Sequence, residues 1–128
     1  MRDPDELIAA FEALTLPKAE WTHEAHVVVC WTTVARLGAG GALAHLRTAI
    51  PRYNEATGTA NTDTGGYHDT ITCYYVAAVG ALAGVPLETV LAHSTCSRTA
   101  PLELWSRERL YSVEARRAWV EPDLQPLP

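Results

Sequence analysis

Apolar residues recur at helical spacing along most of this chain, and short polar or glycine-bearing stretches divide the pattern into segments. The first predicted helix begins at Pro4 and is closed by Pro17. The second follows a capping Thr22 and runs to about Leu37, where three closely spaced glycines end it. The third carries its apolar stripe at Leu43, Leu46, Ile50 and Tyr53.

A polar stretch over residues 57–66 separates the third predicted helix from the fourth. It is rich in threonine and glycine, so we interpret it as a loop, and loops of this length are often functional. The fourth predicted helix follows His68 and continues to about Ala83. The remaining predicted elements are a fifth helix at 87–92, two short helices at 102–110 and 113–119, and an extended tail. No segment alternates with a period of two, so we expect few or no strands.

These elements predict an all-α protein, a compact bundle of about five main helices followed by short C-terminal helices and a tail. The 128 residues suffice for one domain with its own core, and we assign residues 1–128 to a single helical domain. Hydrophobic residues make up 48% and charged residues 20% of the chain, as is typical of a soluble globular protein.

Charge and composition exclude several classes of protein. The net charge is −5, Lys18 is the only lysine and no basic run is present, so we expect no nucleic-acid partner. The acidic start lacks the apolar core of a signal peptide, and no apolar run approaches the roughly 20 residues of a membrane span. Cys30, Cys73 and Cys96 show no paired spacing, which argues against a disulfide framework and predicts a cytoplasmic protein.

Three histidines lie at two predicted helix starts. His23 and His26 are three residues apart, so their side chains leave the helix on one face, and His68 lies at the next start. Each helix carries them on an otherwise apolar stripe that is expected to face the core. If the two starts lie side by side, three imidazoles meet and leave a coordination position open. The sequence therefore predicts one divalent transition metal: zinc, copper, iron or nickel.

The positive end of a helix disfavours imidazolium and attracts anions, so we expect neutral histidines near pH 7 and a substrate that carries an anionic group. The competing interpretation is that these are ordinary capping or core histidines, hydrogen-bonded to backbone carbonyls and without a metal.

Glu24, Asp69 and Arg107 are the candidate catalytic residues. Glu24 and Asp69 directly follow histidines, and either could act as a general base or orient a metal ligand. For both acidic residues the preferred interpretation is favourable placement at a helix N-terminus. Arg107 lies in an arginine-rich stretch and is our candidate for holding a substrate carboxylate or phosphate, with a solvated helix and local ion pairs as the alternative.

Four stretches of this chain resemble a family of small uncharacterised bacterial proteins. They are WTHEAH at 21–26, GYHDTIT at 66–72, YSVEAR at 111–116 and WVEPDL at 119–124. The likeness covers the chain from Trp21 onward and implies a free-standing protein, without implying an activity.

The histidines lead us to expect a metalloenzyme that acts on a small molecule. Zinc would favour hydrolysis by an activated water, whereas copper or iron would favour oxidation. One alternative is a carrier module that binds a metal or ligand without turning it over, and another is a structural role without a metal. The oligomeric state stays open.

Overall fold

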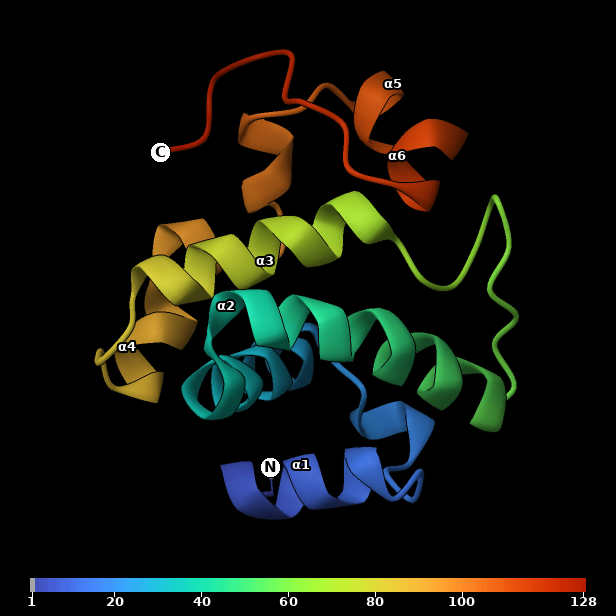
Figure 1. Ribbon diagram of the computed structural model, residues 1–128, viewed down its shortest axis with the longest axis vertical. Helices are drawn as coiled ribbons and strands as arrows, with labels where there is room; N and C mark the ends of the chain where they lie inside the picture. The colour runs from blue at the N-terminus through green and yellow to red at the C-terminus, as the bar shows by residue number, and fades with distance from the viewer. Residues whose placement is uncertain (1) are drawn as a thin grey trace.

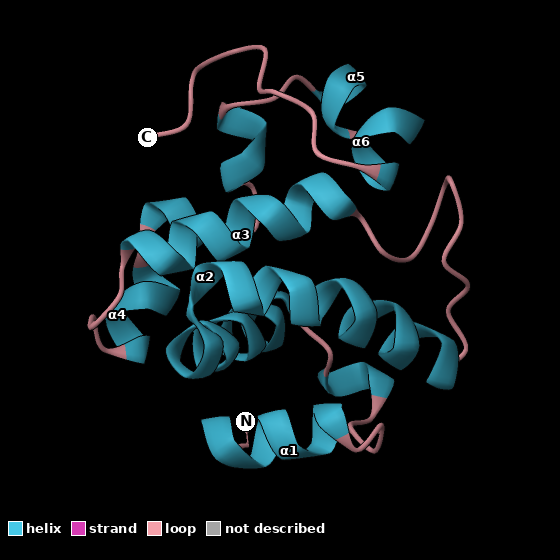
Figure 2. Ribbon diagram, in the orientation of Figure 1, coloured by secondary structure: helices cyan, strands magenta, loops and turns pink. Residues whose placement is uncertain are grey.

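The structure, a computed structural model, describes residues 2–128, and within that range 63% of the chain is helical and no strand is present (Figure 2). The three main helices are α1 (Pro4–Glu12), α2 (His23–Ala56) and α3 (Asp69–Ala81). They lie in successive layers, with α2 between α1 and α3 (Figure 1). The remaining elements are the short helices α4 (Leu87–Ala92), α5 (Arg107–Leu110) and α6 (Val113–Arg117) and the 3-10 turns η1 (Lys18–Glu20), η2 (Ser94–Cys96) and η3 (Ala100–Glu103).

The all-α class is confirmed, but the expected five main helices are wrong. The second and third predicted helices are the two arms of α2, and the backbone at Gly38 between them is non-helical, so the predicted break is present although the arms continue into one another across a kink. Gly38 has φ 74° and ψ 170°, and a residue without a Cβ adopts this left-handed φ without steric cost. The predicted fifth helix is α4, with six residues, so α1, α2 and α3 make up most of the helical structure.

Short-range capping determines where the main helices begin. Asp3 Oδ1 accepts a hydrogen bond from the N–H of Glu6 at 2.9 Å, which caps α1. Thr22 Oγ1 accepts from the N–H of Ala25 at 3.2 Å, which caps α2 as the sequence predicts. Both signals act within one helical turn, so the sequence shows them directly.

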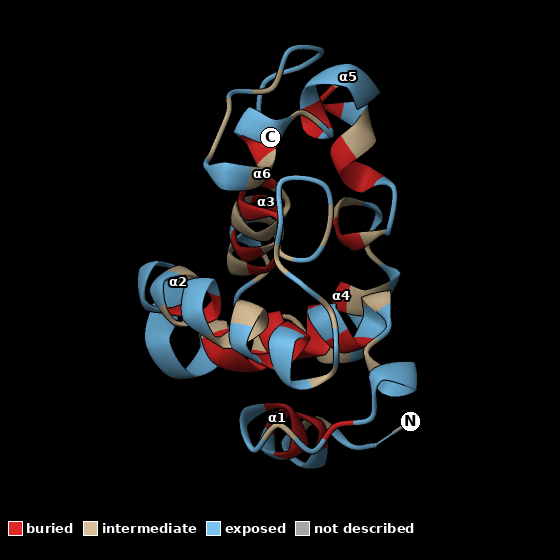
Figure 3. Ribbon diagram, turned by 90° about the vertical axis from the view of Figure 1, so that its right-hand side faces the viewer, coloured by how far each residue is buried: buried red, intermediate tan, exposed pale blue. Residues whose placement is uncertain are grey.

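Two apolar clusters hold the helices together. The main core lies between α1, both arms of α2 (residues 23–37 and 39–56) and α3, and its buried residues include Leu7, Phe11, Val28, Leu46, Tyr53 and Val79. Buried segments, red in Figure 3, gather where these helices face one another. A smaller cluster on the other side of α3 contains Tyr74, Ala100, Leu104, Trp105 and Leu110. The predicted inward stripe of α2 stops before Leu37, which is 53% exposed.

Helix α2 is long and apolar enough to cross a membrane by length and composition alone, with a mean hydropathy of 1.5 over 18 residues. This was not predicted from the sequence. The core helix of a soluble protein passes the same test, and α2 supplies many buried residues to the main core. The kink at Gly38 also divides it into two arms, residues 23–37 and 39–56.

The predicted loop over residues 57–66 is confirmed, and Asn61 ties it down. Asn61 Nδ2 donates to the carbonyl of Pro51 at 2.9 Å. Its Oδ1 accepts from Asn54 Nδ2 and from the N–H of Tyr67, both at 3.0 Å. These bonds make the segment a fixed connection between α2 and α3, and none of its residues lines the cavity described next.

Candidate functional site

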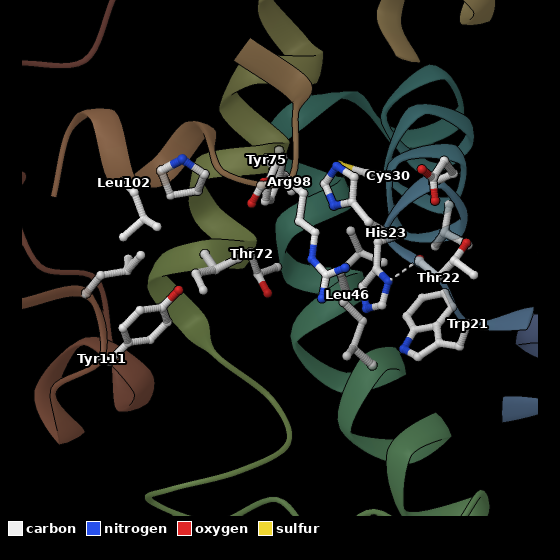
Figure 4. A pocket seen from close by; sticks show the side chains of 18 residues that line it. Trp21, Thr22, His23, Cys30, Leu46, Thr72, Tyr75, Arg98, Leu102 and Tyr111 are labelled. Carbon is white, nitrogen blue, oxygen red and sulfur yellow. Dashed lines mark hydrogen bonds between the residues drawn. The ribbon is translucent and has the colours of Figure 1, made fainter. Parts of the chain in front are cut away.

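A cavity of about 590 Å³ lies where the two arms of α2, the first half of α3 and residues 98–111 meet. Its walls are mainly apolar and include Val29, Leu46, Ile50, Ile71, Val76 and Leu102. A few polar side chains converge on the same space, notably His23, His26, Thr72, Tyr75 and Arg98 (Figure 4). An apolar cavity with a small number of placed polar groups is the usual form of a small-molecule site.

His23, the first residue of α2, connects this helix to η2. Its Nε2 lies 2.8 Å from the carbonyl oxygen of Cys96, and because a carbonyl only accepts, Nε2 carries the proton. The edge of the ring packs against Tyr75, with 5.3 Å between the ring centroids. His23 therefore holds one wall of the cavity in place.

His26 is fixed by different contacts. Its Nδ1 lies 2.7 Å from the carbonyl oxygen of Thr22, and because a carbonyl only accepts, Nδ1 is the donor. The ring stacks on Trp21 with 3.7 Å between the centroids, and Trp21 stacks on Phe11 at 4.9 Å. Within residues 2–128, His26 Nε2 has no hydrogen-bond partner, and His26 lines the cavity.

The electrostatic environment keeps His26 neutral at pH 7. Burial among protein atoms lowers the pKa of His26 to about 4, the bond to Thr22 opposes this shift, and nearby His23 adds to it. Part of the ring remains exposed, and water reaching it moderates the shift without reversing its direction. The neutral state agrees with the sequence-based expectation, but its main cause is burial, not the helix dipole. Nε2 therefore presents a lone pair.

His68 has no free ring nitrogen. It caps α3, because its Nδ1 accepts from the N–H of Ile71 at 3.2 Å. Its Nε2 donates to the carbonyl of Leu110 at 2.6 Å. The residue is 8% exposed, and burial lowers its pKa although the Leu110 bond opposes the shift. His68 joins α3 to α5 and does not line the cavity.

The histidines as placed do not fit the metal site predicted from the sequence. A histidine ligand binds through a ring nitrogen lone pair, and both nitrogens of His68 are occupied by the backbone. Across the described chain, no group of three or more His, Cys, Asp or Glu side chains is placed to hold a metal ion. His23 and His26 both line the cavity. His68 does not line it and instead caps α3.

Asp69 is the buried partner of an ion pair with Arg47, whose side chain is half-exposed. Its Oδ1 and Oδ2 accept from Arg47 Nε and Nη2 at 3.0 and 3.1 Å, and the hydroxyl of Tyr67 donates to Oδ1 at 2.8 Å. Burial alone would raise the pKa of Asp69, but the bonds from Arg47 and Tyr67 outweigh it and hold the pKa below its usual value. This saturated carboxylate links α2 to α3 and does not line the cavity.

Glu24 and Arg107 occupy exposed positions. Glu24 lies at the cavity rim, but two positions correspond to about 200° of helical rotation, so it leaves α2 on the side opposite His26. Arg107 begins α5 and does not line the cavity. Of the three predicted catalytic residues, Glu24 alone reaches the cavity.

The arginine that points into the cavity is Arg98, which was not predicted (Figure 4). The hydroxyl of Tyr75 donates to the carbonyls of Ser97 at 2.6 Å and Arg98 at 3.3 Å and so positions this backbone. The sequence offers one signal that could have pointed to this residue, because Arg98 is the only lysine or arginine between Arg52 and Arg107. That isolation does not show which surface the side chain faces.

Comparisons of this chain with protein-family models, curated proteins and solved structures find no match. The resemblance to small bacterial proteins stays a prediction. The function is therefore inferred from the geometry of the cavity.

Proposed function

We propose that this protein binds a small, mainly apolar molecule in the cavity between α2, α3 and residues 98–111. The observation that carries the proposal is the cavity itself, about 590 Å³ within a chain of 128 residues. The space opens to solvent at exposed residues such as Thr22 and Tyr111, and a mainly apolar cleft with a few placed polar groups is the usual form of a ligand site. Burying the apolar part of a ligand there would remove the apolar surfaces of both the ligand and the cavity wall from water, which favours binding.

Hydrogen bonds across the cavity support a site that is formed before the ligand arrives. His23 Nε2 holds the carbonyl of Cys96, and the hydroxyl of Tyr75 holds that of Ser97. These bonds connect η2 and the residue after it to α2 and α3. A wall held in this way costs little conformational entropy when the ligand binds, which favours affinity.

Among the functions expected from the sequence, ligand binding without turnover has the best support. The metalloenzyme would need His68 to release Ile71 and Leu110 before it could bind a metal. The cavity requires no such rearrangement, and its apolar lining suits a small molecule.

Acid–base catalysis on the bound molecule is a second candidate, favoured by the unpartnered Nε2 of His26. In that role Nε2 would accept a proton while the Nδ1–H bond to Thr22 stabilises the imidazolium. The lowered pKa makes this nitrogen a weak base, so binding remains the better supported function. Cys30 also lines the cavity, but burial raises the pKa of its thiol to about 12 and leaves no thiolate nucleophile near pH 7.

The neutral fluorescent probe N-phenyl-1-naphthylamine tests the binding proposal. We expect saturable fluorescence enhancement with the native protein and at least tenfold weaker binding by Ile50→Trp, about 1.4 kcal/mol, because the larger side chain fills the cavity. The matched control is Leu37→Trp. Leu37 is an exposed residue of the same helix outside the cavity, so this variant should bind the probe as tightly as the native chain does. Far-ultraviolet circular dichroism checks folding, and Ile71→Phe provides a second cavity-filling variant. Absence of saturable binding, or equal binding by all folded variants, would overturn the proposal.

A further inference from the structure

We infer that the ligand is an apolar monocarboxylate and that the guanidinium of Arg98 holds its carboxylate. This inference rests on the proposed binding function and specifies the chemistry of the molecule bound. It depends on one unpartnered cation in a mainly apolar cavity.

The other arginines are paired or lie elsewhere. Ion pairs occupy Arg2, Arg47 and Arg117, and backbone carbonyls occupy Arg109 and Arg116. Within residues 2–128, the arginines without a hydrogen-bonded or ion-paired side chain are Arg36, Arg52, Arg98 and Arg107, and of these Arg98 alone lines the cavity. An unpaired guanidinium that points into an apolar space is a receptor for an anion.

The surroundings of Arg98 strengthen such a pair. The planar guanidinium fork matches the two oxygens of a carboxylate. Arg98 is an exposed residue, so solvent screens part of this attraction, and the apolar walls beside the side chain strengthen the rest. The bonds from Tyr75 position the backbone that carries the side chain, so less conformational freedom is lost on binding.

Charge counting favours a monoanion over a phosphate. Arg98 is the only permanently charged cation on the cavity wall, and His26 is neutral at pH 7 because burial lowers its pKa. A dianionic phosphate would leave one negative charge without a partner in an apolar space, at a cost in desolvation. Glu24 is the one carboxylate among the lining residues, and its exposed position at the rim limits its repulsion of an anion.

Displacement of N-phenyl-1-naphthylamine by decanoate, decanol and decyl phosphate at pH 7.5 tests this inference, since the three share one alkyl chain. We expect the native protein to bind decanoate at least tenfold tighter than decanol and tighter than decyl phosphate. In Arg98→Gln this preference should disappear, so that decanoate and decanol bind with about equal affinity. Arg98→Lys should retain part of the preference, because lysine keeps the charge and loses the fork. Arg107→Gln is the matched control outside the cavity and should behave as the native protein.

The outcomes separate this inference from the function on which it rests. Equal affinities for decanoate and decanol, with the probe still bound, would overturn the inference that the ligand is a carboxylate and would leave the cavity as a binding site. Tighter binding of decyl phosphate that depends on Arg98 would replace the carboxylate by a phosphate. Failure of the probe itself to bind would instead overturn the proposed function.

Discussion

At the start of α2 the capping side chain is Thr22, whereas at the start of α3 it is His68. The threonine leaves His26 free to bond the carbonyl of Thr22 through Nδ1 and to keep Nε2 open to the cavity. At α3 the imidazole itself accepts from the first turn, and its other nitrogen is taken by Leu110. The identity of the capping residue thus decides whether a histidine at a helix start is available for chemistry.

The acidic residues that follow these histidines differ in the same way. Asp69 is buried and accepts from Arg47 and Tyr67, whereas Glu24 is exposed at the cavity rim. The start of α3 is therefore a structural junction with all its polar atoms satisfied. The start of α2 keeps polar atoms open toward a cavity, which is where a ligand can bind.

Replacing each histidine by alanine should show the largest difference between the two helix starts. His68→Ala loses both the α3 cap and the Leu110 bond and should lower the free energy of unfolding by about 3 kcal/mol. His26→Ala loses one hydrogen bond and its stacking on Trp21 and should cost about 1 kcal/mol. Urea unfolding with linear extrapolation measures both values. His68→Asn, with a capping oxygen restored, should recover about 1 kcal/mol, and equal losses for the two alanine variants would contradict the comparison.

The acidic pair should show a smaller difference. Asp69→Asn removes the charge that Arg47 faces and should lower the free energy of unfolding by about 2 kcal/mol, since Asp69 is buried while Arg47 stays half-exposed. Glu24→Gln should change it by less than about 0.5 kcal/mol, as is usual for an exposed side chain. Thermal and urea unfolding of the two variants provide the measurement. A loss for Glu24→Gln as large as that for Asp69→Asn would refute the assignment of Asp69 as the structural carboxylate.

The dependence of stability on pH should report the neutral histidines. His26 and His68 have a folded-state pKa below the unfolded value of about 6.5, so the unfolded chain takes up protons first. The free energy of unfolding is therefore expected to fall as the pH drops from about 6.5 toward 4. Asp69, whose pKa is also lowered, adds a further loss below about pH 4. Unfolding of His26→Gln between pH 7 and 4.5 should show a shallower decline, and an unchanged slope would contradict the lowered pKa of His26.

Added zinc is expected to have no effect on the histidine at the start of α3. Nitrogen-15 NMR of the imidazoles is expected to show His68 protonated on Nε2 and His26 on Nδ1. One equivalent of zinc should leave the two His68 nitrogen resonances unchanged, because neither nitrogen is free. Stoichiometric zinc that shifts His68 together with His23 and His26, and is lost in His68→Ala, would restore the three-histidine site.

Signals that act within one helical turn were predictable from the sequence. The helix start at Pro4, the cap at Thr22 and the break at Gly38 depend on residues within one helical turn, and the structure contains all of them. Whether Gly38 ends a helix or only kinks it depends on what the second arm packs against, which the local pattern does not contain. The helix count was therefore wrong while the helix starts were right.

Signals of this local kind could not predict the cavity. Arg98 and Tyr75 stand 23 residues apart, and their meeting depends on how η2 packs across α3. His68 looked equivalent to His26 because both follow a break in the helical pattern. The backbone carbonyl of Leu110, which occupies its second nitrogen, lies 42 residues further along the chain.

The amino-acid sequence by itself determined the helical class and the main helix starts, because periodicity and capping are local. Tertiary structure alone decided which imidazole nitrogens stay free, which arginine enters the cavity and that a cavity exists. Those properties depend on atoms brought together from distant parts of the chain by burial of the two apolar clusters, and no short stretch of sequence encodes that meeting.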